Sequence, residues 1–135
     1  MTIVPEFVER IPQIIEEGKI YISTSVNTAI HLCPCGCKTE IVTPIDPSEW
    51  YFTYNGETIS LYPSVGVWGA VCKSHYWIKK NQIEWSRTYS KQEIEEVRTQ
   101  ETIENQKYYD YLKSEKNNKK RISWFRRLLK LFDIY

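Results

Sequence analysis

All four cysteines and both histidines of this 135-residue chain fall into two short patches. The first patch, residues 31–37 (HLCPCGC), places three thiols within five residues, and the second, residues 72–75 (CKSH), follows much later in the chain. Thiolates and imidazoles are the donors that Zn²⁺ takes in tetrahedral protein sites. Pro34 and Gly36 suit a tight turn that presents several ligands at once. The two patches therefore predict a zinc site that joins distant segments.

The candidate ligands outnumber the four positions of such a site. They are Cys33, Cys35, Cys37, Cys72 and His75. The favoured set is a Cys₃His site with Cys33, one of Cys35 and Cys37, Cys72 and His75, and the next is a Cys₄ site that leaves His75 free. His31 is a poorer candidate, because we expect it on a strand that leads into Cys33. Buried thiols without metal are the remaining alternative.

A structural role for the metal is favoured over a catalytic one. A catalytic zinc keeps one position open and needs a general base nearby, and the chain has no His-Glu-x-x-His motif. Another possible enzyme would use Ser64 as a nucleophile activated by His31. No Gly-x-Ser-x-Gly elbow surrounds Ser64, so the sequence favours an ordinary turn residue at this position. A spare cluster thiol could also act as a nucleophile with His31 or His75, or accept a thioester.

The elements that position these residues are mostly short strands. Alternating or β-branched runs predict strands over residues 19–23, 28–32, 38–43, 50–54, 57–61, 71–78 and 82–86. Asn55-Gly56 predicts a two-residue hairpin loop that pairs Phe52 with Ile59. Residues 63–69 are rich in turn formers and predict a loop with an exposed Trp68.

The hydrophobic period changes at Ser90. Ser90 and Glu93 have the spacing of a capping box, which predicts a helix start. The predicted fold class is α+β: a zinc-stabilised antiparallel β domain over residues 1–88, a mostly polar helix over 89–118, and a basic amphipathic tail helix over 119–135. Asn117-Asn118 is expected to separate the two helices. The tail's apolar stripe consists of Phe125, Leu128, Leu129 and Phe132.

The charges divide unevenly along the chain. Residues 1–112 hold ten basic and fifteen acidic residues (net −5), and residues 113–135 hold eight basic and two acidic ones (net +6). The basic tail could dock on a protein, lie on an anionic membrane surface through residues 119–132, or contact nucleic acid. The acidic body disfavours nucleic acid. No signal peptide or spanning segment is visible, so we expect a cytoplasmic protein.

The ordered motifs resemble a family of small bacterial proteins described as a probable metal-binding domain of unknown function. They are His31-x-Cys-Pro-Cys-Gly-Cys, then Ser60-Leu61-x-Pro-Ser-Val-Gly-x-Trp68, then Cys72-x-Ser-His-Tyr-Trp-Ile78. The resemblance covers about residues 18–86. Proteins of this kind are encoded beside bacterial ubiquitin-like conjugation genes, including an E1-like enzyme, an E2-like enzyme and a JAB-type metalloprotease. One departure is Lys38, where the family commonly has glycine.

The resemblance implies a role in or near a ubiquitin-like modification system. We expect a zinc-binding accessory or adaptor protein that contacts a ubiquitin-like modifier, an E1-like or an E2-like protein. A zinc- or thiol-dependent hydrolase or transferase of the same pathway is the alternative. A nucleic-acid-binding zinc ribbon comes third.

Overall fold

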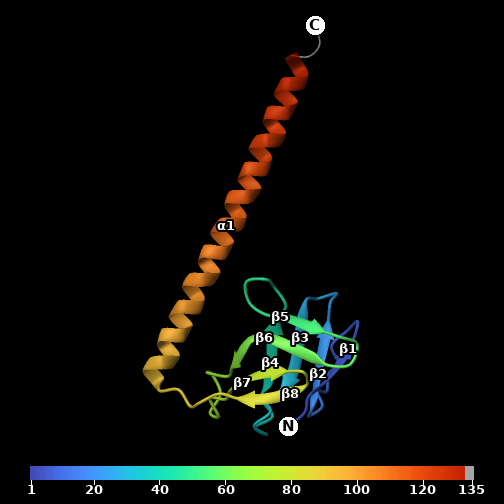
Figure 1. The fold of residues 1–135 in the computed structure, drawn as a ribbon, viewed down its shortest axis with the longest axis vertical. Helices are drawn as coiled ribbons and strands as arrows, with labels where there is room; N and C mark the ends of the chain where they lie inside the picture. Colours follow the sequence, from blue (N-terminus) through green and yellow to red (C-terminus); the bar gives the residue numbers. More distant parts are fainter. Residues whose placement is uncertain (133–135) are drawn as a thin grey trace. The chain divides into compact units, whose positions relative to one another are not determined.

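A computed structural model describes residues 1–132 of the chain. It divides into two compact units, Met1–Ile94 and a second unit that begins at Glu95. The first unit holds eight strands in two four-stranded sheets, and the second continues a long helix (Figure 1). This arrangement confirms the predicted α+β class.

The first sheet carries the cysteine-rich segment at one end. Its strands are β1 (Val4–Phe7), β2 (Lys19–Ser23), β3 (Thr28–Leu32) and β4 (Glu40–Pro44), in that spatial order. β1 runs parallel to β2, and the other pairs are antiparallel. The turn between β3 and β4 therefore presents residues 33–39 at one end of this sheet.

The second sheet is antiparallel throughout and carries the second patch. Its strands are β5 (Tyr51–Tyr54), β6 (Ile59–Gly66), β7 (His75–Lys79) and β8 (Gln82–Trp85). β7 alternates in burial, with Tyr76 and Ile78 fully buried and His75 and Trp77 partly exposed. His75 and Trp77 therefore lie on the face of the sheet turned away from the core.

One hydrophobic core joins the two sheets. It combines side chains of β2 and β3 with side chains of β6, β7 and β8, including Ile20, Ile22, Ala29, Ile59, Leu61, Val65, Tyr76, Ile78 and Ile83. A polar contact crosses this core, where His31 Nε2 and the Tyr76 hydroxyl lie 2.7 Å apart. Both side chains are completely buried, so this hydrogen bond satisfies groups that would otherwise be costly to desolvate.

The β5–β6 hairpin has a different register from the predicted one. Phe52 pairs with Leu61 and Tyr54 with Ile59, so the loop has four residues, 55–58, instead of two. The Asn55 side chain explains the longer loop, because its Oδ1 accepts hydrogen bonds from the backbone N–H groups of Glu57 and Thr58. The shift is an even number of residues, so the same side chains still face the core.

β6 continues through residues 63–66, where the sequence predicted a loop. Its pairing with β7 is irregular: Leu61 lies opposite Ile78 and Val65 opposite Tyr76. From Leu61 to Val65, β6 advances four residues, while its partner β7 advances only two, from Ile78 to Tyr76. β6 therefore contains two extra residues at this point. Such a bulge re-aims the side chains within it.

The chain then forms one continuous helix, α1 (Lys91–Phe132). Ser90 and Glu93 form the predicted capping box, with Ser90 N donating to the Glu93 carboxylate and Glu93 N to Ser90 Oγ. The predicted interruption at Asn117-Asn118 is wrong, because asparagine costs only about 0.7 kcal/mol in a helix whose neighbours are good helix formers. The structure does not describe the side chains of the predicted apolar stripe, Phe125, Leu128, Leu129 and Phe132. Residues 133–135 are also outside the described part of the chain. No helix within residues 1–132 is long and apolar enough to cross a bilayer.

Candidate functional site

The turn between β3 and β4 brings three thiols to one point. Cys33 N donates to Thr39 O and Gly36 N to Cys33 O, which closes the turn on itself. Gly36 has φ +91° and Lys38 has φ +60°, both in the left-handed region. The Cys-Pro-Cys-Gly-Cys spacing is therefore folded into a compact knuckle, as the sequence predicted.

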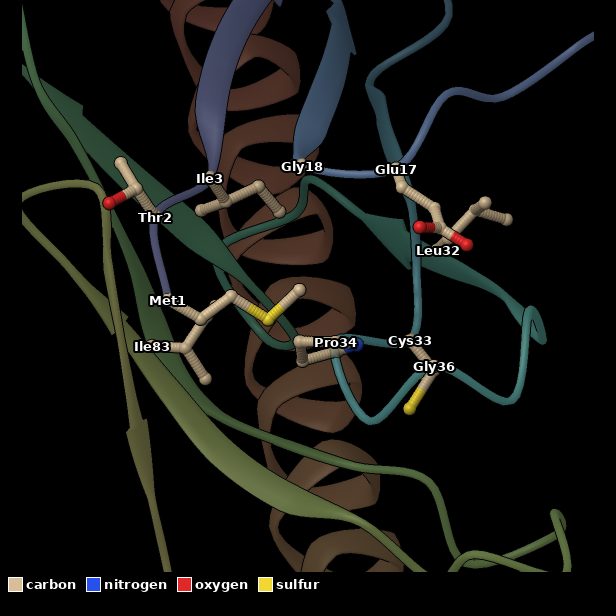
Figure 2. A pocket seen from close by; sticks show the side chains of 10 residues that line it. All are labelled: Met1, Thr2, Ile3, Glu17, Gly18, Leu32, Cys33, Pro34, Gly36 and Ile83. Atoms are coloured by element: carbon tan, nitrogen blue, oxygen red, sulfur yellow. The ribbon is translucent and has the colours of Figure 1, made fainter.

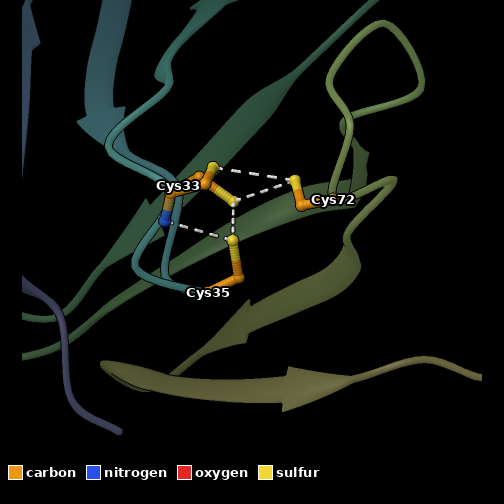
Figure 3. A group of neighbouring side chains, drawn as sticks. Cys33, Cys35 and Cys72 are labelled. Atoms are coloured by element: carbon orange, nitrogen blue, oxygen red, sulfur yellow. Dashed lines mark hydrogen bonds between the residues drawn. The ribbon is translucent and has the colours of Figure 1, made fainter.

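The fourth thiol comes from the loop between β6 and β7. Figure 3 shows Cys33 and Cys35 of the knuckle facing Cys72 across a short gap. The sulfur–sulfur distances are 3.4 Å for Cys33–Cys35, 3.9 Å for Cys33–Cys72 and 3.7 Å for Cys37–Cys72, and none of the four is in a disulfide. All four sulfurs lie within 4.8 Å of one another. Four cysteines are thus positioned to hold one metal ion.

The geometry and donor type fit a tetrahedral thiolate site. Four sulfurs bound 2.3 Å from a central zinc at tetrahedral corners would lie about 3.8 Å apart, close to the observed spacings. Burial raises the pKa of Cys33 to about 12, whereas hydrogen bonding with Thr39 lowers the pKa of Cys37 to about 6. A buried Cys33 thiolate therefore needs a cation beside it, which a metal ion supplies.

His75 is not part of this group. Its Nε2 lies 2.8 Å from Ser64 Oγ, on the face of the second sheet turned away from the core. The structure thus brings Cys33, Cys35, Cys37 and Cys72 together and places the fifth candidate against a serine. Of the two ligand sets considered, the four-cysteine set is the one that shares a common centre.

The Ser64–His75 pair depends on the bulge in β6. Gly66 is the register partner of His75, and Ser64 lies two residues earlier, inside the irregular segment. The Trp50 indole Nε1 donates to Ser64 O at 3.4 Å, which anchors the serine backbone. A serine hydroxyl within hydrogen-bond reach of an imidazole is the arrangement of an activated nucleophile and its general base.

Three aromatic rings surround His75. Its ring centroid lies 5.0 Å from Trp68, 5.3 Å from Trp77 and 4.9 Å from Tyr89. Burial among these rings lowers the pKa of His75 below its usual value, so the imidazole is neutral at pH 7 and able to accept a proton. We name Trp68, Trp77 and Tyr89 the aromatic clamp.

Among the described residues, His75 lacks the hydrogen-bonded carboxylate of a Ser-His-Asp triad. In such triads the acid bonds to Nδ1 and orients the imidazole. Here Nδ1 of His75 is buried and has no hydrogen-bond partner among the described residues. Ring packing is what holds the imidazole in this structure, and the bond from Ser86 N to His75 O holds the backbone of His75.

The alternative that Ser64 is activated by His31, which the sequence already disfavoured, does not hold in the structure. His31 lies between the sheets, bonded to Tyr76, whereas Ser64 is on the opposite face of the second sheet. Burial also lowers the pKa of His31 to about 4, so it remains neutral. The turn interpretation of Ser64 is wrong as well, because its hydroxyl contacts His75 within a strand.

A small cavity lies behind the knuckle, and Figure 2 shows its lining side chains. It is bounded by Met1, Ile3, Leu32, Cys33 and Ile83, among others, and its volume is about 20 Å³. That volume holds about one water molecule. The cavity is therefore a packing feature beside Cys33 rather than a substrate site.

Together, the fold and the site define a small two-sheet β protein that combines a four-thiol cluster with a serine–histidine pair. Residues 7–86, more than half of the chain, match a family described as "Bacterial ubiquitination-like system serine protease (BubE)", and the chain belongs to this family. The resemblance drawn from the sequence motifs is thereby confirmed. Searches of curated proteins and of solved structures found no match.

Proposed function

We propose that this chain is a serine protease of a bacterial ubiquitination-like system, with Ser64 as nucleophile and His75 as general base. The observation that carries the proposal is the 2.8 Å contact between Ser64 Oγ and His75 Nε2 on a partly exposed face. The family description supports the same chemistry. The substrate class is a ubiquitin-like modifier or its conjugates.

The residues suggest the following sequence of proton transfers. His75 Nε2 takes the Ser64 hydroxyl proton as Oγ attacks the substrate carbonyl, and a tetrahedral intermediate forms. His75 then gives that proton to the leaving amine, which departs and leaves an acyl ester on Ser64. Water, deprotonated by His75, attacks the ester and releases the carboxylic acid. The serine hydroxyl recovers its proton from His75.

The proposal includes zinc bound by Cys33, Cys35, Cys37 and Cys72. Four thiolates leave no open position, so the metal supplies structural cross-linking. Cys72 lies in residues 67–74, the loop that joins Ser64 on β6 to His75 on β7. Bound metal would fix that loop against the knuckle and so hold the two strand ends in place.

The test is labelling by an alkyl fluorophosphonate, which reacts with activated serines and carries no side chain. Intact mass should show one adduct per chain, located at Ser64 by peptide mapping. Ser64→Ala and His75→Gln should each abolish labelling, and Ser25→Ala, which replaces an exposed serine elsewhere, should not. Absence of an adduct on the metal-loaded wild-type chain would refute the proposal.

A second candidate is the adaptor role expected from the sequence. The observation that favours it is α1, which carries exposed large apolar side chains at Ile103, Tyr109, Tyr111, Ile122 and Trp124. Such side chains on a polar helix suit contact with a ubiquitin-like modifier, an E1-like or an E2-like protein in the cytoplasm. Titration calorimetry with each purified partner tests it. Ser64→Ala should keep the affinity, and truncation at Lys113, which removes Ile122 and Trp124, should lower it.

A further inference from the structure

A second concavity lies on the segment that joins β4 to β5 and at the start of β5. It is lined by Ile45, Asp46, Pro47, Trp50 and Tyr51, is open to solvent and has a volume of about 280 Å³. Four of its five walls are apolar or aromatic side chains. It belongs to neither the cysteine cluster nor the aromatic clamp.

The walls of this pocket are held in place by the loop's own hydrogen bonds. Asp46 Oδ1 accepts from both the backbone N–H and the hydroxyl of Ser48. Asp46 N donates to Trp50 O at 3.0 Å, and Glu49 N donates to Asp46 O at 2.9 Å. The loop is therefore a closed turn, and the concavity exists before any ligand arrives.

Two walls of the pocket also contact the strand that carries Ser64. The Trp50 indole donates to the carbonyl of Ser64 itself, and the Tyr51 ring stacks on Tyr62, two residues before Ser64 (5.3 Å between centroids). The pocket therefore adjoins the backbone of the strand segment that carries Ser64.

Beyond the end of β5, the edge of β6 near the pocket has no paired strand among the described residues, and the Trp50 indole is the group that meets the Ser64 carbonyl there. β5 ends its pairing at Tyr51 opposite Tyr62, so residues 63–66 run past the end of β5. In the part of the chain that the structure describes, no strand pairs with residues 63–66 on that side. Extended peptides bind such strand edges through their backbone and place alternate side chains into pockets.

We propose that the pocket of Ile45, Pro47, Trp50 and Tyr51 is a specificity subsite that takes a large apolar or aromatic side chain of the polypeptide substrate beside the bond attacked by Ser64. This inference rests on the proposed serine protease function and deepens it. The aromatic walls favour flat rings. Asp46, which also lines the pocket, disfavours an acidic side chain, because hydrogen bonds from Ser48 lower its pKa and keep its carboxylate ionised.

The experiment uses diphenyl aminoalkylphosphonates, which label active serines and carry one amino-acid side chain. Probes with the side chains of Phe, Leu, Ala and Asp are compared on the full chain, and each labelling rate is divided by the rate with the alkyl fluorophosphonate. Wild type should prefer Phe or Leu over Ala by about tenfold or more, with Asp slowest. Division by the side-chain-free probe removes any general effect of a variant on Ser64.

Variants at Tyr51 test the pocket wall, because this side chain is 54% exposed and its removal is tolerable for folding. Tyr51→Ala should lower the Phe-to-Ala ratio by about tenfold, and Tyr51→Phe should retain it. The matched control is Tyr54→Ala, which removes the same side chain from the same strand outside the pocket. It should leave the ratio as in wild type.

Either of two results would refute the proposed subsite and leave the proposed serine protease function intact. These are equal rates for Phe and Ala probes on wild type, or an unchanged ratio in Tyr51→Ala, each with Ser64 still labelled by the alkyl fluorophosphonate. If that small probe does not label Ser64 at all, the proposed function fails and the subsite fails with it.

Discussion

The cysteine cluster and the Ser64–His75 pair share the loop of residues 67–74, which contains Cys72 and runs from the strand of Ser64 to His75, yet the two sites are built in different ways. Three of the four thiols come from a single five-residue knuckle, and only Cys72 is distant. Ser64 and His75 both come from strands, and their contact depends on how β6 is paired with β7. The loop of residues 67–74 belongs to both sites. The cluster thus depends mainly on one short turn that meets this loop at Cys72. The Ser64–His75 pair depends on the register between β6 and β7.

The largest expected effect separates the two sites by function. His75→Gln should reduce labelling or hydrolysis by about 10³-fold or more, because the general base is lost. Metal content, measured by elemental analysis, should remain one zinc per chain, since the four cysteines are untouched. Loss of zinc in His75→Gln would instead indicate that His75 is a metal ligand, as in the Cys₃His set.

The next effect tests whether the cluster supports the pair. Cys72→Ser should lose the metal and lower the free energy of unfolding by several kcal/mol, because metal binding stabilises the folded state. Labelling of Ser64 should fall as well, since the loop between the strands is released. Thermal unfolding with and without chelator measures the first effect.

The control for that substitution is Val71→Ala, which removes a fully exposed side chain from the same loop. It should keep metal, stability and labelling. Full activity in metal-free Cys72→Ser would show that the two sites are independent.

A smaller effect concerns the aromatic clamp. A Cβ at Gly66 would overlap the Trp68 indole, so Gly66→Ala should displace Trp68 from His75. Because a misplaced catalytic group costs up to about 10²-fold, we expect kcat to fall by roughly tenfold. Gly69→Ala is the matched control, since a Cβ there meets nothing within 4 Å. Equal kcat values for Gly66→Ala and Gly69→Ala would show that the aromatic clamp does not contribute to catalysis.

The pH dependence sharpens the same point. His75 must be neutral to accept the serine proton, and burial lowers its pKa below 6.5. The midpoint of the acid-side decline in kcat/KM should therefore lie below pH 6.5. Tyr89→Ala, which opens one side of the clamp, should move the midpoint of kcat/KM upward. A wild-type midpoint at or above 6.5 would contradict this assignment.

The smallest effect lies within the knuckle. Lys38 has φ +60°, a conformation that costs a non-glycine residue about 1 kcal/mol. Lys38→Gly should therefore raise the free energy of unfolding by up to about 1 kcal/mol, measured by denaturant titration of the metal-loaded chain. Metal stoichiometry and Ser64 labelling should be unchanged. A loss of stability would mean that the lysine side chain contributes contacts that outweigh its backbone strain.

Much of the fold was predictable because its strands are short and strongly patterned. The strands at residues 19–23 and 28–32 have the predicted bounds. The register of the β5–β6 hairpin was not predictable. The Asn55 side chain accepts two backbone hydrogen bonds and so favours a four-residue loop, which the Asn-Gly pair alone does not indicate. The continuous helix was missed for a similar reason, since two asparagines cost less than their turn propensity suggested.

By itself, the sequence determined the cysteine-rich metal site and a mostly antiparallel β domain followed by helix, whereas the division of the strands into two sheets came from the structure. Thiols concentrated in a five-residue turn meet under almost any fold, so residue type and spacing were enough to predict a metal site. Only the tertiary structure decided which histidine meets Ser64. Two extra residues in β6 turn the serine toward His75, and the core holds His31 on the far side of the same sheet. Strand register is set by the packing of whole sheets, which no local pattern around Ser64 encodes.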